Sequence, residues 1–598
     1  MLKLTALKAA STLTDVAILL DIKPGMLSYT LYKKPKAALY STFTIPKRFG
    51  GTREISAPSK ELKIIQHRLT LLLELCQVEI NASQGHTEDT SKSGIAHGFK
   101  KNHSILTNAR PHVARRRVFN VDLHDFFGSI NFGRVRGFFI ANKHFALAPK
   151  VATILAQIAC HNNKLPQGSP CSPIISNFIG HTLDILLVRL AKATDCTYTR
   201  YADDLTFSSN KPKFSSRVAR QPDPDLHEWE PGHELQRALK RSGFSLNDKK
   251  TRMQYRDSRQ IVTGLTVNRK PNVPATYRYT VRAMAHSLFT TGSFNFVGKT
   301  GDSKEGDVIT KTPGTKAQLL GMLAYIDFVD FRNRQLREEN GLPPVNTLGR
   351  IALFRRVLYF DYFYSASAPL IICEGKTDNV YIRCAIKSLA SKYPDLATSE
   401  SPPKLTVKLF KYAERRTHHV TEIAGGVGGL CKLIKNYHAD VTSTFKAPAS
   451  KYPVIILIDN DSGANGVFGA IAGITGKHRP TGNESFIHVT ANLYVVPTPL
   501  LPDVDKTEIE DFFDTKTLET KLNGKTFDPR NDTDSAKHYG KAAFARDVVA
   551  KGSTTIDFSG FLGVLDRIVE AMVDYYSKHP SRGPTIAKPP GITASSTT

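Results

Sequence analysis

Cysteine is scarce in this sequence, and the few cysteines present form no metal-binding pattern. The 598 residues include seven cysteines, an odd number, and no two of them form a C-x-x-C pair. This usage argues against structural zinc and favours reduced thiols in a cytoplasmic protein. The sequence also lacks an uncharged apolar run of transmembrane length. Its first residues lack the apolar core and cleavage site of a signal peptide, so we expect none.

Acidic residues are in short supply relative to basic ones. The chain has 81 Lys and Arg residues against 54 Asp and Glu residues, a formal net charge of +27 and a pI near 9.6. A protein this basic usually binds a polyanion, most often nucleic acid. An acidic membrane surface is the alternative, but no dense basic amphipathic helix supports it. At 598 residues the chain is too long for one hydrophobic core, so several domains are expected.

One acidic pair is placed where a turn would not ordinarily tolerate it. Asp203 and Asp204 lie within Tyr201-Ala202-Asp203-Asp204-Leu205-Thr206-Phe207, and the flanking aromatic and β-branched residues predict two short strands joined by a tight turn. Two adjacent carboxylates suit a divalent cation, because hard cations prefer carboxylate oxygens. A solvated hairpin tip is the alternative for this segment taken alone.

Three segments before that turn carry residues suited to phosphate or metal. Lys47 and Arg53 flank a predicted Gly-Gly hairpin and suit a triphosphate, although ordinary surface basicity is the alternative. Asp122 lies near the end of a buried strand predicted over 118–123, where an acid is costly unless it binds a cation. A helix N-cap is the other interpretation of such an acid. Gln167 lies in a Pro/Gly-rich turn that could hold a base or sugar, or that simply begins a helix of about 174–192.

In order and spacing, these blocks resemble the reverse transcriptases, and among them the bacterial retron enzymes most closely. The resemblance covers about residues 30–330. It rests on Ala96-His97-Gly98-Phe99, Asp122 with Asp125-Phe126-Phe127, Leu165-Pro166-Gln167-Gly168-Ser169-Pro170, the Asp203-Asp204 segment, Gly243-Phe244 with Lys250, and Val262-Thr263-Gly264. Six blocks that agree in order make a merely structural explanation of the ensemble improbable.

The resemblance implies a right-hand polymerase with fingers, palm and thumb. In such an enzyme Asp122, Asp203 and Asp204 hold two Mg²⁺ ions that activate the primer hydroxyl and stabilise the departing pyrophosphate. Lys250 is placed to protonate or neutralise the pyrophosphate, with Lys249 as an alternative register.

The same resemblance implies contacts with nucleotide and RNA. Lys47, Arg53 and Gln167 would contact the incoming deoxynucleoside triphosphate. The ring of Phe127 would block a ribose 2′-hydroxyl and so select deoxynucleotides. The block formed by Val262, Thr263 and Gly264 would help bind the enzyme's own structured RNA.

The second half of the sequence predicts acids at the edge of a parallel sheet. Glu374 follows an apolar strand at 370–373, and Asp459 and Asp461 follow a second one at 454–458. Buried parallel strands deliver such residues to the carboxyl edge of a sheet, and two acids in an Asp-x-Asp pair could share one metal. A calcium-like surface loop is the alternative, but the remaining ligand spacing is absent. Gly375-Lys376-Thr377 is not a phosphate loop, because that motif needs a glycine where Leu370 stands.

This arrangement resembles the Toprim domain of topoisomerases, primases and old-type nucleases, over about residues 369–515. The resemblance implies one or two Mg²⁺ ions bound by Asp459 and Asp461, with Glu374 as a ligand or general acid/base and Glu510 as a further acid of the nuclease branch. Because no tyrosine nucleophile can be identified, a nuclease is favoured over a topoisomerase. A catalytically silent docking module is the alternative.

These resemblances together predict an α+β right-hand polymerase followed by an α/β Toprim domain with a parallel sheet and a helical C-terminal extension. The expected domains are fingers and palm at 1–280, a helical thumb at 281–365, Toprim at 366–515, the extension at 516–580 and a disordered tail at 581–598.

The expected function is that of a retron polymerase. It would copy a partner non-coding RNA into RNA-linked multicopy single-stranded DNA from a 2′-hydroxyl primer, and the Toprim nuclease would act as an effector in anti-phage defence. The rivals are a mobile-element reverse transcriptase, a primase-like enzyme and a non-enzymatic scaffold. No membrane partner is expected, and formation of a homo-oligomer stays open.

Overall fold

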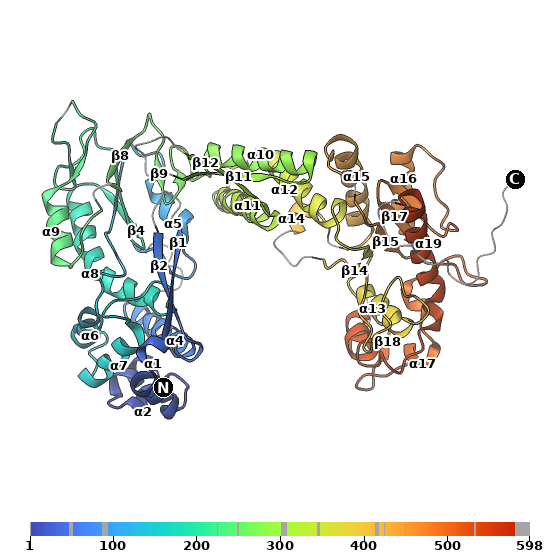
Figure 1. Ribbon diagram of the computed structural model, residues 1–598, viewed down its shortest axis with the longest axis horizontal. Coiled ribbons are helices and arrows are strands. Elements are labelled where there is room, and N and C mark those ends of the chain that lie inside the picture. Colours follow the sequence, from blue (N-terminus) through green and yellow to red (C-terminus); the bar gives the residue numbers. More distant parts are fainter. Residues whose placement is uncertain are drawn as a thin grey trace. The chain divides into compact units, whose positions relative to one another are not determined.

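The computed structural model of the chain contains two compact units (Figure 1). The N-terminal unit comprises Met1–Arg278, Lys299–Ile309 and Val329–Gly341, and the C-terminal unit comprises Tyr279–Gly298, Thr310–Phe328 and Leu342–Thr598. Each unit is described by itself. The described residues are 2–46, 52–85, 94–223, 225–247, 250–300, 308–343, 347–412, 418–423, 425–448, 450–530 and 534–580. Lys47, Lys249 and the predicted tail at 581–598 therefore lie outside the described residues.

A four-stranded antiparallel sheet in the order β4-β5-β3-β8 lies at the centre of the N-terminal unit. Its strands are β3 (Arg117–Asp122), β4 (Thr197–Tyr201), β5 (Asp204–Ser209) and β8 (Arg252–Tyr255). The apolar residues of β3 and β5 are buried, which agrees with the strand predicted over 118–123. The register places Asp122 directly opposite Asp204.

Most helices of the N-terminal unit share one hydrophobic core with this sheet. The helices of this unit are α1 (Lys3–Ala9), α2 (Leu13–Leu19), α3 (Pro24–Ser28), α4 (Lys60–Ser83), α5 (Ile105–Ala109), α6 (Phe132–Ala141), α7 (Pro149–Ala159), α8 (Ser172–Ala193) and α9 (His233–Arg241). Within the described residues, α8 alone is long and apolar enough to pass a membrane-span test by composition. Its Ile175, Leu183 and Leu187 are fully buried, which is the behaviour of a core helix.

Two hairpins border the sheet of the N-terminal unit. β1 (Tyr40–Pro46) pairs with β2 (Thr52–Pro58) in the predicted hairpin, and most of β1 is exposed. β9 (Ile261–Val262) pairs with β10 (Leu265–Thr266) around a two-residue turn. A further short pair joins β6 (Ala219–Arg220) to β7 (Glu230–Pro231).

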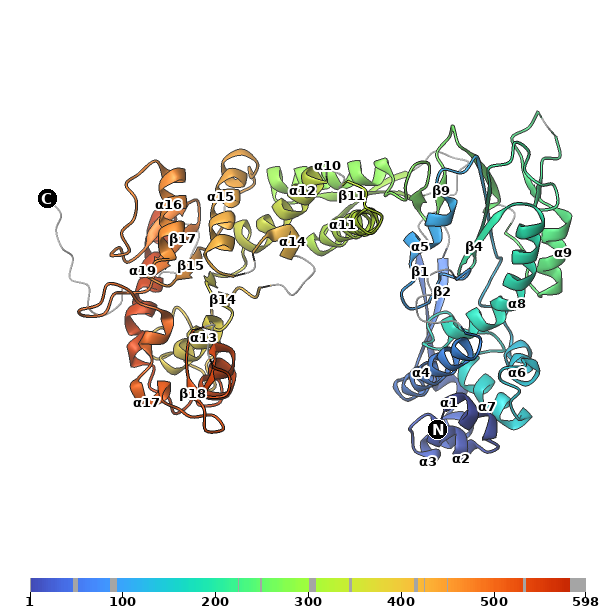
Figure 2. The same cartoon turned by 180° about the vertical axis from the view of Figure 1, so that it is seen from behind.

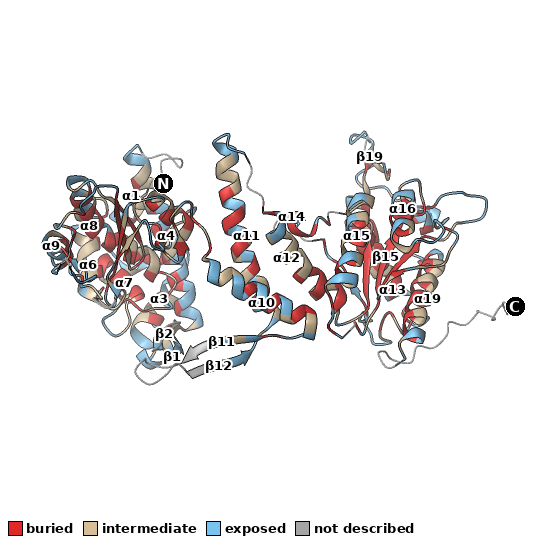
Figure 3. Cartoon of the chain, turned by 90° about the horizontal axis from the view of Figure 1, so that it is seen from above, coloured by how far each residue is buried: buried red, intermediate tan, exposed pale blue. Residues whose placement is uncertain are grey.

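A five-stranded sheet in the order β14-β13-β15-β17-β16 forms the centre of the C-terminal unit. The strands are β13 (Leu370–Cys373), β14 (Lys408–Leu409), β15 (Val454–Ile458), β16 (Ile487–Thr490) and β17 (Leu493–Pro497). All pairs are parallel except β16 with β17. Every residue of β15 is buried, as Figure 3 shows, because an internal parallel strand is covered on both faces.

The helices of this unit surround the sheet and continue beyond it. They are α13 (Asp378–Ser388), α14 (His418–Thr421), α15 (Val427–Ser443), α16 (Ala464–Thr475), α17 (Thr515–Leu518), α18 (Lys541–Ala543) and α19 (Leu562–Lys578). The expected extension at 516–580 is not entirely helical, because β18 (Thr526–Phe527) pairs with β19 (His538–Tyr539). Helix α19 packs against β17 (Figure 2), where the Tyr494 hydroxyl donates to Asp574 at 2.8 Å, so the extension belongs to the core of this unit.

The segment expected to form a helical thumb contains three helices and a pair of strands, and it is divided between the two units. It contains α10 (Ala275–Thr291), α11 (Lys316–Glu339) and α12 (Leu348–Tyr359), with β11 (Asn295–Thr300) and β12 (Val308–Pro313) between the first two. Most of α10 and all of α12 belong to the C-terminal unit. There the ring of Phe289 packs against Phe360 and Phe445, and the Tyr359 hydroxyl donates to the carbonyl of Thr421 at 3.0 Å.

Candidate functional site

The acidic pair lies on a two-residue turn between the central strands β4 and β5. Tyr201 pairs with Asp204, so Ala202 and Asp203 form the turn, and Ala202 has a φ of 56°. The Leu123 amide donates to the carbonyl of Asp203 at 2.9 Å. Pairing of β3 with β5 thus brings Asp122 beside Asp203 and Asp204, although it is far from them in sequence.

A buried ion pair between Arg200 and Asp184 fixes the position of this turn. Arg200, which is fully buried, donates from Nε and Nη2 to the two carboxylate oxygens of Asp184 at 2.8 and 2.7 Å. It also donates to the carbonyl of Ala202 at 3.2 Å. The residue before Phe99 in the Ala-His-Gly-Phe block must be glycine, because a Cβ on Gly98 would lie 2.5 Å from the Ala202 nitrogen. The Ala-His-Gly-Phe block therefore packs directly against the turn formed by Ala202 and Asp203.

The three carboxylates lie in a region with too little compensating positive charge. Asp122 is only 6% exposed, and both of its oxygens accept from Lys250 Nζ at 2.9 Å. Burial, together with the charges of Asp203 and Asp122, raises the pKa of Asp204 to about 7. Burial and the charge of Asp122 also raise the pKa of Asp203. Such a group suits a bound cation, which relieves the repulsion that raises these pKa values.

The acids are nevertheless not arranged as a finished metal cage. Across the described ranges, no three acidic, histidine or cysteine side chains form a group that could hold a metal ion by themselves. The ammonium group of Lys250 contacts both oxygens of Asp122. The donor set fits Mg²⁺ in chemistry, and substrate oxygens complete such a site in phosphoryl transfer.

A cavity of about 670 Å³ contains Asp122 and Asp203 together with most of the residues expected to contact nucleotide. Arg53 of β2, Phe127, Gln167 and Lys250 line it. The carbonyl of Gln167 accepts from the Ser56 amide at 2.8 Å, which fixes the Pro/Gly-rich turn against β2. His124 and Lys164 also line this cavity, and neither was singled out from the sequence.

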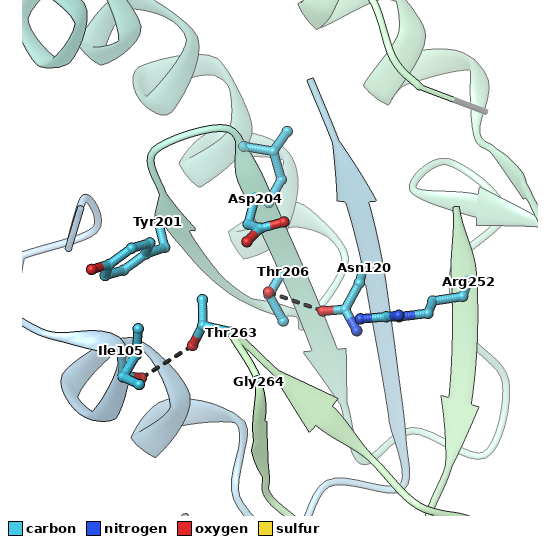
Figure 4. Close-up of a pocket in the computed structure, with 9 residues that line it drawn as sticks. Ile105, Asn120, Tyr201, Asp204, Thr206, Arg252, Thr263 and Gly264 are labelled. Atoms are coloured by element: carbon cyan, nitrogen blue, oxygen red, sulfur yellow. Dashed lines mark hydrogen bonds between the residues drawn. The ribbon is translucent and has the colours of Figure 1, made fainter. Parts of the chain in front are cut away.

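The neighbouring carboxylate, Asp204, lines a second and smaller cavity of about 190 Å³ (Figure 4). Thr263 and Gly264 face it from the turn between β9 and β10, and Arg252 faces it from β8. Val262 is fully buried, whereas Thr263 and Gly264 line the cavity. The sequence offered no motif that would have identified Arg252.

A second group of acids lies at the carboxyl edge of the parallel sheet in the C-terminal unit. Glu374 directly follows β13 and Asp459 directly follows β15, and these two strands are adjacent. Asp378, at the start of α13, and Glu510 complete the group, and both are buried. Asp378 was not identified from the sequence, although its position four residues after Glu374 is a usable signal.

Burial and mutual repulsion characterise this second group. They raise the pKa of Glu374 to about 7 and that of Asp459 to about 8. Glu374 Oε2 and Glu510 Oε1 are buried and have no hydrogen-bond partner in the described structure. Lys541 Nζ contacts Glu508 at 3.2 Å and Glu510 at 3.1 Å and is only partly exposed. Orphaned buried carboxylate oxygens with raised pKa values fit a bound divalent cation.

Asp461 is placed differently from Asp459. Its Oδ1 accepts from the amides of Gly463 and Ala464 at 2.8 and 3.2 Å, so it caps the start of α16. The repulsion that raises the pKa of Asp459 comes from Asp378, Glu374 and Glu510, whereas Asp461 acts on the pKa of Glu374. A metal ion shared by Asp459 and Asp461 would therefore also lie beside Glu374, because Glu374 interacts with both acids.

Comparison with known proteins places the first half of the chain. Residues 45–299 match the family model described as reverse transcriptase (RNA-dependent DNA polymerase). The Retron Mx65 reverse transcriptase of Myxococcus xanthus is 33% identical over 336 residues, which are 53% of this chain and 68% of that protein. The Retron Ec86 reverse transcriptase of Escherichia coli is 31% identical over 253 residues, 42% of this chain and 70% of that protein.

Two further similarities are less complete. The Retron Mx162 reverse transcriptase of Myxococcus xanthus is 35% identical over 317 residues, but the match spans only 49% of this chain and 58% of that protein. Among solved structures, apo telomerase from Candida tropicalis, truncated from its C-terminal domain, matches at 12% identity, 40% and 56% coverage and a TM-score of 0.27, which is too low to support an argument. The matches to Mx65 and Ec86 show that the chain belongs to the retron reverse transcriptases.

Proposed function

We propose that the enzyme copies a structured non-coding RNA into single-stranded DNA that stays linked to the RNA through a 2′-hydroxyl of a guanosine. The observation that supports this most is the acidic turn between two cavities. Asp203 lines the cavity with nucleotide-binding chemistry, and Asp204 lines the cavity beside Thr263 and Gly264. Incoming nucleotide and primer would thus approach the turn from different cavities.

The residues of the larger cavity would divide the work of nucleotide addition. Arg53 would hold the triphosphate through its guanidinium, and Gln167 would fix the base or sugar. Phe127 would close the space that a ribose 2′-hydroxyl needs. Lys250 would pass from Asp122 to the departing pyrophosphate and neutralise its charge.

Asp122, Asp203 and Asp204 would hold the Mg²⁺ ions of the polymerase site. When bound, these ions supply Lewis-acid stabilisation of the attacking and leaving oxygens. Buried Asp122 and the partly buried Asp203 and Asp204 would contribute by fixing the position of the metal site relative to the primer cavity. Reverse transcriptases in general use Mg²⁺ in this site.

This proposal is tested by purifying the protein together with its neighbouring RNA gene product and analysing the bound nucleic acid. A short DNA covalently attached to RNA is expected, absent from the Asp203→Asn variant and present in the Asp459→Asn variant. DNA that is never linked to RNA would instead favour a mobile-element type of reverse transcriptase. Unchanged function after Asp203→Asn would favour a non-enzymatic scaffold.

We further propose that the acids of the C-terminal unit form a Toprim-type nuclease site, which acts as an effector in anti-phage defence. Glu374 and Asp459 on adjacent parallel strands, with Glu510 and Asp378 beside them, support it. The two orphaned carboxylate oxygens would bind Mg²⁺, and one of the acids would transfer a proton during cleavage of a phosphodiester.

The nuclease proposal needs a separate measurement. Mg²⁺-dependent cleavage of nucleic acid is expected from the wild type and lost in Asp459→Asn, with Asp203→Asn as the matched control that keeps it. If both variants and the wild type bind nucleic acid equally and none cleaves it, the unit is a docking module. Ribonucleotide polymerisation that requires Asp459 would identify a primase-like enzyme.

A further inference from the structure

The small cavity beside Asp204 contains a cationic side chain that nucleotide addition in the larger cavity does not use. Its walls are formed by β3, β5 and β8, by Tyr201 of β4, by Ile105 of α5 and by the Thr263-Gly264 turn (Figure 4). At about 190 Å³ it is smaller than the roughly 300–1,000 Å³ of sites that enclose whole small molecules. It therefore suits one chemical group of a larger substrate.

Arg252 is the positively charged side chain of this cavity. It stands opposite Asn120 in the register of β3 and β8. The Asn120 amide is already used, because it donates to the carbonyl of Ile261 at 3.0 Å and accepts from Thr206 at 3.0 Å. In the described part of the chain the Arg252 guanidinium has no hydrogen bond or ion pair, and the side chain is exposed. Arg252 and Asp204 line the same cavity, so the guanidinium lies on the side of the acidic turn that Asp204 faces.

Priming from a 2′-hydroxyl creates a requirement that priming from a 3′-hydroxyl does not. The 2′-oxygen bonds to the α-phosphorus of the incoming nucleotide, the bond from that phosphorus to the bridging oxygen breaks, and pyrophosphate leaves with the electron pair while the hydroxyl proton passes to water. The priming ribose meanwhile keeps its 3′-phosphodiester on the adjacent carbon. This extra negative charge must lie close to three carboxylates, which repel it unless a cation faces it.

We propose that Arg252 binds the 3′-phosphodiester of the priming ribonucleotide in this cavity. The inference rests on the proposed 2′-hydroxyl priming and adds a binding residue that serves initiation alone. A guanidinium suits the task because it can donate two parallel hydrogen bonds to a phosphate. Thr263 and Gly264, both at positive φ (46° and 83°), form the opposite wall and leave it without a bulky side chain.

Two reactions of the same enzyme preparation separate this role from a general one. The first is initiation on the structured RNA, measured as the rate of the first RNA-linked nucleotide. The second is extension of a DNA primer with an ordinary 3′-hydroxyl on an RNA template. Arg252→Gln is expected to lower the ratio of initiation to extension at least tenfold, and Arg252→Lys less so. Arg256→Gln removes the same charge four residues later, outside the cavity, and should leave the ratio within twofold.

A change in the RNA provides an independent check. In a two-piece RNA whose first piece is synthesised to end in 3′-deoxyguanosine as the priming nucleotide, the 2′-hydroxyl is kept and the 3′-phosphodiester is missing, so Arg252→Gln and the wild type should initiate equally. The inference is overturned if Arg252→Gln lowers both reactions alike, spares initiation, or stays defective on the two-piece RNA. If the wild type extends the DNA primer but never forms RNA-linked DNA, the proposed function itself fails, and the inference fails with it.

Discussion

Removing the buried carboxylate of Asp184 should loosen the turn that carries Asp203 and Asp204. Asp184 is 3% exposed and accepts three hydrogen bonds, two from the Arg200 guanidinium and one from the Tyr198 hydroxyl at 2.9 Å. In Asp184→Asn, the N–H group of the new amide faces the hydrogen-bond donors of Arg200 and Tyr198 and cannot accept from them. The charge of Arg200 then stays buried without a counter-charge. Breaking one partner of a buried ion pair costs about 3–5 kcal/mol.

The cost should be smaller when both charges are removed together. Arg200→Met with Asp184→Leu replaces the pair by apolar groups of similar size, which is often near neutral in stability. A coupling energy of about 2 kcal/mol or more is therefore expected in the double-mutant cycle formed by Asp184→Leu, Arg200→Met and their combination. The double variant should still lose polymerase activity, because the Ala202 carbonyl no longer receives the Arg200 hydrogen bond that fixes the turn.

Hydrogen exchange of the amides in β4 and β5, read by mass spectrometry, is the suitable assay, because one global unfolding free energy is not defined for a chain with two units. The opening free energy of these strands should fall by about 3–5 kcal/mol in Asp184→Asn and recover in the double variant. A fall of less than about 1 kcal/mol, or a double variant as unstable as the single one, would refute the reasoning.

Three further outcomes are expected. Phe127→Ala should raise incorporation of ribonucleotides relative to deoxynucleotides at least tenfold in kcat/KM, and an unaltered ratio would exclude Phe127 as the steric gate. Burial lowers the pKa of His97 to about 4 and that of His112 to about 3, so the unfolded chain, whose histidines titrate near 6.5, binds more protons at pH 5. Each histidine should therefore lower the stability of the N-terminal unit by about 2 kcal/mol between pH 7 and pH 5. The raised pKa of Asp204 acts in the opposite direction over this range, so the measurement compares the pH dependence of the denaturation midpoint in the wild type and in His112→Asn. Equal pH profiles for the two proteins would contradict the burial argument. Lys541→Met should lower the melting midpoint of the C-terminal unit because it leaves buried Glu510 without its cation, and adding Glu510→Gln should restore the midpoint; no recovery would show that the ion pair is not the cause.

Much of the polymerase site could be predicted because its residues lie in local patterns with a direct physical meaning. Strand patterns and a tight turn predicted the Asp203-Asp204 hairpin, and the end of a buried strand predicted Asp122. The assignment to the retron reverse transcriptases, made from the order of six blocks, is confirmed by the relatives. Arg252 and Lys164 could not be found in this way, since a single basic residue in a basic chain carries no local signal.

In the C-terminal unit, too, some features could be predicted from the sequence and others depended on the fold. The apolar runs at 370–373 and 454–458 predicted parallel strands that end in acids, and the sheet has both strands side by side. Its assignment to Toprim and the nuclease activity stay predictions. Asp378 depended on the fold, because its carboxylate joins the group only through the turn that begins α13, where it accepts from the Gly375 amide at 2.6 Å.

By itself, the sequence determined the main strands of the two central sheets, the basic character that indicates nucleic acid, and the acids available for metal, but not the short strands β11, β12, β18 and β19. Hydrophobic periodicity and turn chemistry are local, so they can be read along the chain. Only the tertiary structure decided that Asp203 and Asp204 line different cavities, that Arg252 stands beside one of them, and that Asp461 caps a helix. These facts depend on strand register and on contacts between distant residues, where a shift of one position would turn every side chain to the other face.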